Sequence, residues 1–249
     1  MLEQLRQQLK ALQKPAGLED SLGALPLGIA AIDDVLGGGL ARGALHEIAA
    51  PAEAHLAAAT AFTLGLMPAS TRVLWVAEDM ACIESGGPYG PGLDAFKLMP
   101  ERLLTIVVSR PRDLLWAMEE ALRCRAIGAV IGEIRHGALD AVAVRRLSLA
   151  AGDSGALALL LRAKPGGDAS TAATRWIVGA APSSHPHTYQ FGAPRFATHL
   201  TRNRRGPTSS WILEWSDTDG RFVLAAPALP VAAPALDRPR RQTSSRYVA

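Results

Sequence analysis

The cysteines, two neighbouring histidines and one glycine-rich segment are the first candidates for a metal or phosphate site, and none of them has the spacing of such a site. Cys82 and Cys124 lie far apart and form no Cys-x-x-Cys pair, so we expect neither a zinc site nor a disulfide framework. His185 and His187 offer two imidazoles on a proline-rich segment, which are too few ligands for a metal. The glycine-rich segment 84–92 lacks the lysine and the hydroxyl of a phosphate-binding loop, so it predicts a surface excursion.

The elements that position these residues follow from the apolar pattern. Continuous apolar runs joined by helical patterns are typical of a mostly parallel sheet with helices on both faces. The expected strands are 45–49, 73–77, 103–108, 129–134 and 156–161. The expected helices lie near 53–66, 111–126 and 138–151. Ser109 is the expected N-cap of the helix near 111, because Pro111 suits a first turn.

After Thr174 the pattern changes to strands without intervening helices. These strands are expected at 176–180, 196–200, 211–215 and 222–225. The Asp219-Gly220 pair between the last two predicts a hairpin turn. The expected fold class is therefore α/β, with antiparallel strands at the C-terminal edge of the sheet.

Residues 25–48, LPLGIAAIDDVLGGGLARGALHEI, resemble the beginning of a RecA-family ATPase core. A short helix with an Ile-Asp pair precedes a Gly-Gly-Leu-x-x-Gly turn and a strand that ends in Glu-Ile. The glycines allow the positive φ angles of a turn that reverses the chain. The resemblance implies a RecA-like core over residues 18–226.

The resemblance places the phosphate-binding loop at residues 50–57, APAEAHLA. A working loop has two glycines that let backbone N–H groups approach phosphate, a lysine, and a hydroxyl that binds magnesium. Here Ala50 and His55 replace the glycines, Leu56 replaces the lysine, and Ala57 replaces the hydroxyl. We therefore expect no nucleotide cofactor and no enzymatic activity.

Two carboxylates, Glu78 and Glu133, fall where a RecA-like core keeps its catalytic and magnesium-binding acids. In an intact ATPase, one acid would polarise water and the other would order magnesium. Without the phosphate loop, we interpret both as structural hydrogen-bond acceptors.

The order of three further segments resembles the ImuA family, the RecA-like accessory proteins of the bacterial damage-inducible mutagenesis cassette. These segments are the degenerate loop, 174–183, and 200–207 leading to 211–215. The resemblance implies a cytoplasmic protein of the SOS response and of translesion synthesis. Its implied partners are an ImuB-like polymerase homologue, RecA and an error-prone replicative-type polymerase.

Two regions are candidates for binding these partners. The first is an apolar stripe on a helix expected in residues 1–17, and the second is a set of arginines toward the C-terminus. Some of these arginines lie in a basic tail at 227–249, whose composition predicts disorder. The residues are Leu2, Leu5, Leu9, Leu12, Arg202, Arg204, Arg205, Arg238, Arg240 and Arg241. A homo-oligomer is a further option that the sequence leaves open.

Single-stranded DNA is the other ligand that we consider, because loops after the core strands hold it in a RecA-like fold. The candidate contacts are Arg135, Lys164 and Arg175. These loops offer cations and no aromatic side chain for base stacking, so we expect weak contact without sequence preference.

Two other functions remain open from the sequence. The first is an SOS cell-division inhibitor, a family with a shortened RecA-like fold and no working loop. The second is an ATPase with an unconventional phosphate loop. No apolar run reaches the ~20 residues of a membrane span, so we expect no membrane partner.

Overall fold

The computed structural model describes residues 22–68, 70–135, 137, 139–167, 170–183 and 192–226. Several predictions fall on other residues and therefore lie outside the described chain: the N-terminal helix at 1–17 with its leucines, His185 and His187, and the tail at 227–249 with its arginines.

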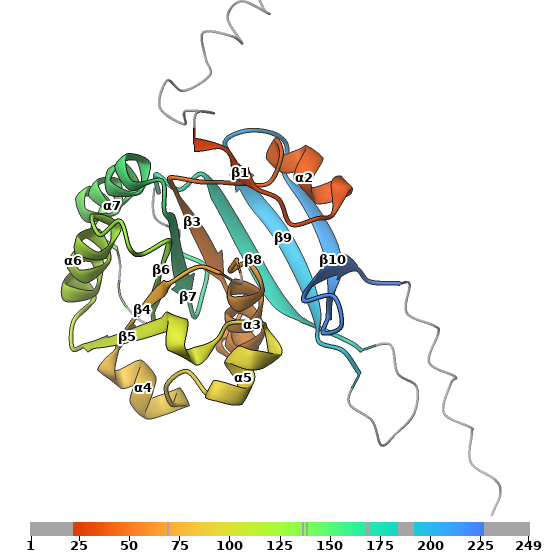
Figure 1. Ribbon diagram of the computed structural model, residues 1–249, viewed down its shortest axis with the longest axis horizontal. Helices are drawn as coiled ribbons and strands as arrows, with labels where there is room; N and C mark the ends of the chain where they lie inside the picture. The colour runs from red at the N-terminus through yellow and green to blue at the C-terminus, as the bar shows by residue number, and fades with distance from the viewer. Residues whose placement is uncertain are drawn as a thin grey trace, which may run out of the picture.

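A nine-stranded sheet forms the centre of the described chain (Figure 1). Its spatial order is β11-β10-β9-β8-β3-β7-β6-β4-β5. The strands are β3 (Ala44–Ala49), β4 (Val73–Glu78), β5 (Leu103–Val108), β6 (Ala129–Ile134), β7 (Leu157–Arg162), β8 (Thr174–Ala181), β9 (Arg195–Asn203), β10 (Ser209–Ser216) and β11 (Arg221–Leu224). Along this order, every neighbouring pair from β5 to β8 is parallel, and every neighbouring pair from β8 to β11 is antiparallel. The predicted fold class is confirmed, including the antiparallel edge and the hairpin at Gly220.

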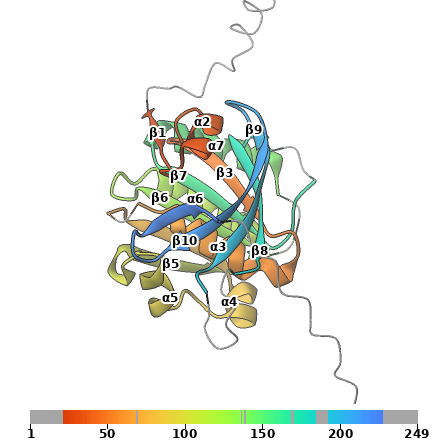
Figure 2. The same cartoon turned by 90° about the vertical axis from the view of Figure 1, so that its right-hand side faces the viewer.

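Helices cover both faces of the parallel half of the sheet (Figures 1 and 2). On one face α6 (Pro111–Leu122) and α7 (Ala141–Ser154) pack over Leu45 and Val130. On the other face α3 (Leu56–Gly65), which follows η2 (Glu53–His55), packs into the core that contains Ile48 and Trp176. Strands β3, β4, β6 and β7 are almost entirely buried, which is why most of their residues are apolar, whereas β5 at the edge of the sheet is largely exposed.

Two short helices, α4 (Asp79–Ser85) and α5 (Gly90–Ala95), include the two ends of the segment 84–92 that the sequence predicted as a surface excursion, and residues 86–89 join them. Smaller elements complete the fold: β1 (Ala24–Leu25), α2 (Ala30–Leu36), β2 (Leu40–Ala41) and η3 (Pro100–Arg102). Figure 1 places α4 and α5 at one end of the sheet and α2 at the opposite end.

The start of α6 differs from the prediction. The prediction that Ser109 caps this helix is wrong, because the N-cap residue is Arg110 and no side chain caps the helix. Instead, Nε of Arg110 donates to Asp113 at 2.8 Å across the first turn. Pro111 does occupy the first turn, as expected.

The glycine turn after α2 has the backbone that the sequence indicated. Gly37, Gly38 and Gly39 have φ angles of 71°, 104° and 123°. A Cβ at Gly39 would lie 2.2 Å from the carbonyl oxygen of Leu25, so both conformation and space require glycine there.

Candidate functional site

The segment 50–57 joins β3 to α3, where a RecA-like core binds phosphate. Leu56 is the first residue of α3, and only 6 % of it is exposed because it packs into the main core. A lysine at this position would extend toward phosphate, whereas Leu56 is part of the apolar interior. Glu53 adds a negative charge in the first turn of η2, which opposes anion binding at this helix start.

Contacts with β8 hold the same segment in place. Nδ1 of His55 accepts a hydrogen bond of 3.1 Å from the backbone N–H of Ala180. A Cβ at Gly179 would lie 3.2 Å from Cγ of Pro51 and 3.4 Å from Nδ1 of His55. His55 therefore ties the loop to the sheet from the position at which an ATPase has its second loop glycine.

The acid of β6 is paired with a cation from its own strand end. Arg135 lies 2.9 Å from Oε1 of Glu133, and the two side chains are 5 % and 12 % exposed. Nε1 of Trp75 donates to Oε2 of Glu133 at 3.2 Å. Both carboxylate oxygens thus accept hydrogen bonds, which supports the interpretation of Glu133 as a structural acceptor.

Glu78 ends β4, the strand beside β6, and Ala77 is in register with Glu133. The two acids therefore lie at the carboxyl ends of neighbouring strands, as the resemblance implied. Glu78 is 6 % exposed. Its burial separates it from any water that an ATPase would have to activate.

A cavity of about 660 Å³ lies beside Glu133, between α3 and the α4–α5 segment. Apolar side chains dominate its walls, among them Leu56, Trp75, Leu93 and Phe96, and Ala57 lies where magnesium would need a hydroxyl. Sequence patterns did not indicate that Trp75 or Phe96 belongs to a site, because each lies in an ordinary apolar pattern. This lining favours apolar groups over a triphosphate.

Cys82 also borders the cavity. Burial, followed by the charges of Glu133 and Asp79, raises the pKa of this thiol. A raised pKa keeps the sulfur protonated at neutral pH, so Cys82 lacks the thiolate that nucleophilic chemistry requires.

Two of the three predicted DNA contacts, Arg135 and Arg175, are paired with acids. Arg135 faces the cavity and pairs with Glu133. Arg175, on β8, pairs through Nε with Oε2 of the buried Glu47 at 2.8 Å. Lys164 is exposed after β7. Two of the three cations therefore neutralise internal acids.

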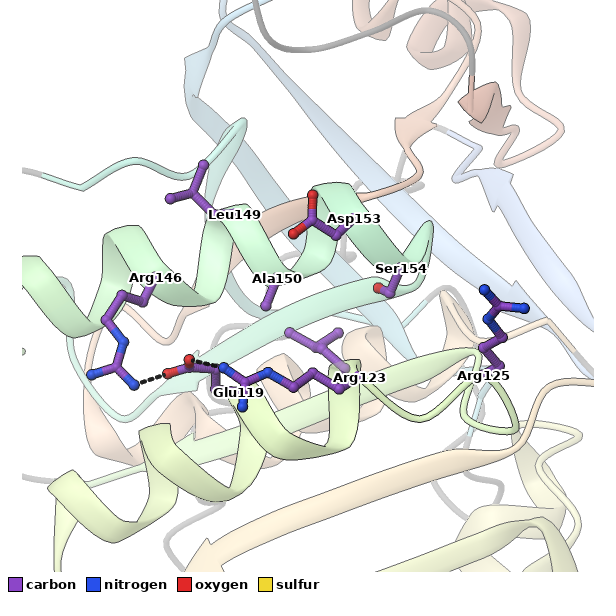
Figure 3. A pocket seen from close by; sticks show the side chains of 9 residues that line it. Glu119, Arg123, Arg125, Arg146, Leu149, Ala150, Asp153 and Ser154 are labelled. Carbon is purple, nitrogen blue, oxygen red and sulfur yellow. Dashed lines mark hydrogen bonds and ion pairs between the residues drawn. The ribbon is translucent and has the colours of Figure 1, made fainter.

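A second hollow of about 420 Å³ lies between α6 and α7 (Figure 3). Glu119 lines it, and its carboxylate contacts Arg123 at 2.8 Å and Arg146 at 2.6 Å. Because the two arginines come from different helices, this network braces α6 against α7. We interpret the hollow as the surface of that brace.

Metal ligands and membrane spans were also sought in the described part of the chain. Among those residues, no group of three or more His, Cys, Asp or Glu side chains is placed to hold a metal ion. Over the same ranges, no helix combines the length and apolar character needed to cross a membrane.

Known proteins resemble this chain in sequence and in fold. Two proteins named ImuA, from Caulobacter vibrioides strains NA1000 / CB15N and ATCC 19089 / CIP 103742 / CB 15, are each 30 % identical to it over 218 residues. Each match covers 80 % of this chain and 86 % of the relative. The crystal structure of the RadB recombinase superposes with a TM-score of 0.54 at 14 % identity, covering 80 % of this chain and 98 % of RadB. That likeness shows a RecA-like fold. No protein-family model matches the chain.

Proposed function

This chain belongs to the ImuA family, and from that membership we propose that it is a non-catalytic accessory protein of the damage-inducible mutagenesis cassette. In this proposal it acts in SOS-induced translesion synthesis by binding protein partners. An ImuB-like polymerase homologue is the first expected partner, and RecA and an error-prone replicative-type polymerase are the others.

The observation that carries the non-catalytic part is the arrangement around Glu133. The acid that would order magnesium is neutralised by Arg135 at 2.9 Å. The lysine position is filled by the buried Leu56. Phosphoryl transfer depends almost entirely on positioned cations around the phosphates. This site lacks the loop lysine and the magnesium hydroxyl, and its arginine is already paired.

The outer edge of the sheet supports the proposal that this chain binds protein partners. Strand β5 is the last strand at its end of the described sheet, so one row of its backbone N–H and C=O groups has no strand partner there. Its sequence is LLTIVV, yet Leu104 and Val107 are 57 % and 53 % exposed. An apolar, exposed edge strand is a template for pairing with another chain.

Other exposed apolar side chains border the same edge. Helix α4 contacts β5, and its residues Met80 and Ile83 are 50 % and 74 % exposed. Natural proteins usually protect edge strands with charges or proline. Strand β5 carries neither, which is consistent with an edge that a partner covers.

The experiment is a pull-down of the purified chain against an ImuB-like polymerase homologue and RecA, with and without Mg-ATP. We expect partner binding that does not depend on ATP. The double variant Leu104→Lys, Val107→Lys should abolish that binding, because two charges on the edge oppose addition of a strand.

The matched control is Val142→Lys, Leu149→Lys on α7, where the replaced side chains are 66 % and 59 % exposed. It adds the same charge at similar exposure and should bind as the wild type does. Binding that requires ATP, or equal loss in both variants, would contradict the proposal.

A further inference from the structure

The end of β9 and the turn to β10, residues 202–208 and here called the β9–β10 turn, are held by several hydrogen bonds and carry three arginines. Nδ2 of Asn203 donates to the carbonyl oxygens of Val35 at 2.8 Å and Pro207 at 3.1 Å. Oδ1 of Asn203 accepts from the backbone N–H of Arg205 at 3.0 Å. A Cβ at Gly206 would lie 2.6 Å from the oxygen of Val35, so the turn is pressed against the end of α2. The arginine backbones are therefore fixed before any ligand arrives.

Arg202 and Arg204 are half-buried and keep their charge. A terminal nitrogen of Arg202 donates to the carbonyl oxygen of Ser170 at 2.5 Å. The backbone N–H of Arg204 donates to the carbonyl oxygen of Ala173 at 3.0 Å. A neutral carbonyl satisfies a donor without cancelling a positive charge. Within the described ranges, neither guanidinium forms an ion pair with a carboxylate.

The nearest strongly buried acid does not offset these charges. The carboxylate of Glu47 receives Nε of Arg175 and the hydroxyl of Ser170 on its two oxygens. Burial, and then the charge of Arg202, lowers the pKa of Arg204, which means that the two cations repel each other. Repulsion between fixed cations is relieved when an anion binds between them.

We propose that the β9–β10 turn, through Arg202 and Arg204, binds the phosphate backbone of a nucleic-acid strand. Guanidinium groups suit phosphate because they donate in a planar fork and stay charged. The turn supplies no aromatic side chain, so contact is through the backbone and carries no base preference.

This surface is separate from the one proposed to bind proteins. The turn lies beside α2, whereas α4 and α5 lie at the opposite end of the sheet (Figures 1 and 2). Strand β5 is at the far edge of the strand order from β9 and β10. Nucleic acid on the turn therefore leaves β5 open to a partner.

The test is fluorescence anisotropy with a labelled oligo(dT) strand over a series of salt concentrations. Arg202→Gln, Arg204→Gln should weaken binding by on the order of tenfold at low salt, and its log–log salt slope should fall by about 0.7 for each lost phosphate contact. Arg202→Lys, Arg204→Lys keeps both charges and should retain the slope. Thermal unfolding of each variant checks that the turn still folds.

The matched control is Arg112→Gln, Arg125→Gln, which removes the same charge from exposed arginines at the two ends of α6. It should bind oligo(dT) nearly as the wild type does. The proposal is overturned if the wild type does not bind at low salt, or if the control loses as much affinity. It is also overturned if the turn variant binds oligo(dT) normally and loses a protein partner instead. None of these results decides the outcome of the pull-down that tests β5.

Discussion

The guanidinium of Arg135 lies 2.9 Å from the carboxylate of Glu133, two residues earlier in the chain and at the same end of β6. In a magnesium-dependent site, an acid at this position shares its charge with a metal ion. Here a side chain of the same strand supplies the compensating charge. The pair accounts for how a buried acid persists beside a segment, residues 50–57, that contains no lysine.

Arg135→Ala should therefore destabilise the protein. It leaves Glu133 buried without its cation, and breaking a buried ion pair costs about 3 kcal/mol. Urea unfolding followed by circular dichroism measures the change. The variant Arg135→Ala, Glu133→Gln should recover much of the loss, because a neutral amide at 133 needs no cation. Equal stability of the wild type and Arg135→Ala would show that the pair does not hold the site together.

The fold was largely predictable because its strands and helices are patterned locally. The runs at 73–78 and 129–134 are mostly apolar, as buried parallel strands are. The same rule misjudged β5, since LLTIVV is indistinguishable from a buried strand and its exposure depends on which strands flank it. Likewise, the pairing of Arg175 with Glu47 joins residues 128 positions apart, and no local pattern reveals it.

His46 makes stability depend on pH. Its Nε2 lies 2.9 Å from the carbonyl oxygen of Ala41, and its Nδ1 lies 2.7 Å from Oγ1 of Thr174, which accepts from Nε1 of Trp176. This arrangement suits a neutral ring with its proton on Nε2. Burial lowers the pKa of His46 from 6.5 to about 4.

Because the folded pKa lies below the unfolded one, the unfolded state binds the proton first as pH falls. The contribution of His46 to the free energy of unfolding is therefore constant above pH 6.5. It falls toward pH 4 by about 1.4 kcal/mol per pH unit. Urea unfolding across this range should show the decline, and His46→Gln should flatten it. An unchanged slope in the variant would assign the acid sensitivity to other groups.

Two glycines should respond oppositely to alanine. A Cβ at Gly65 would lie 2.4 Å from Cζ of Phe222 and 3.0 Å from Cζ3 of Trp215, so Gly65→Ala should cost about 1–3 kcal/mol through overpacking. Gly152 lies inside α7, where the nearest atom would be 3.7 Å away. Gly152→Ala should stabilise by about 0.5–1 kcal/mol. Thermal unfolding of the two variants tests both signs together.

Removing the charge of Glu119 should loosen the two helices that it joins. Glu119→Gln loses ion pairs to Arg123 and Arg146, whose side chains are more than half exposed, so the expected cost is about 1 kcal/mol. Glu120 contacts only Arg123 among these residues and is 44 % exposed. Glu120→Gln should therefore change stability less. A larger effect of Glu120→Gln than of Glu119→Gln would refute the interpretation that Glu119 braces α6 against α7.

The absence of a working phosphate loop predicts that Mg-ATP leaves the stability of this protein unchanged. A ligand present at about a hundredfold its Kd raises the free energy of unfolding by about 2.7 kcal/mol, which a thermal shift detects readily. With Leu56 buried and Arg135 held by Glu133, we expect no shift and no phosphate release above a blank. A shift with Mg-ATP, together with phosphate release that disappears in Glu78→Gln or Glu133→Gln, would identify an ATPase with an unconventional loop. Nucleotide binding without hydrolysis would leave the accessory role intact only if partner binding in the pull-down stayed independent of ATP.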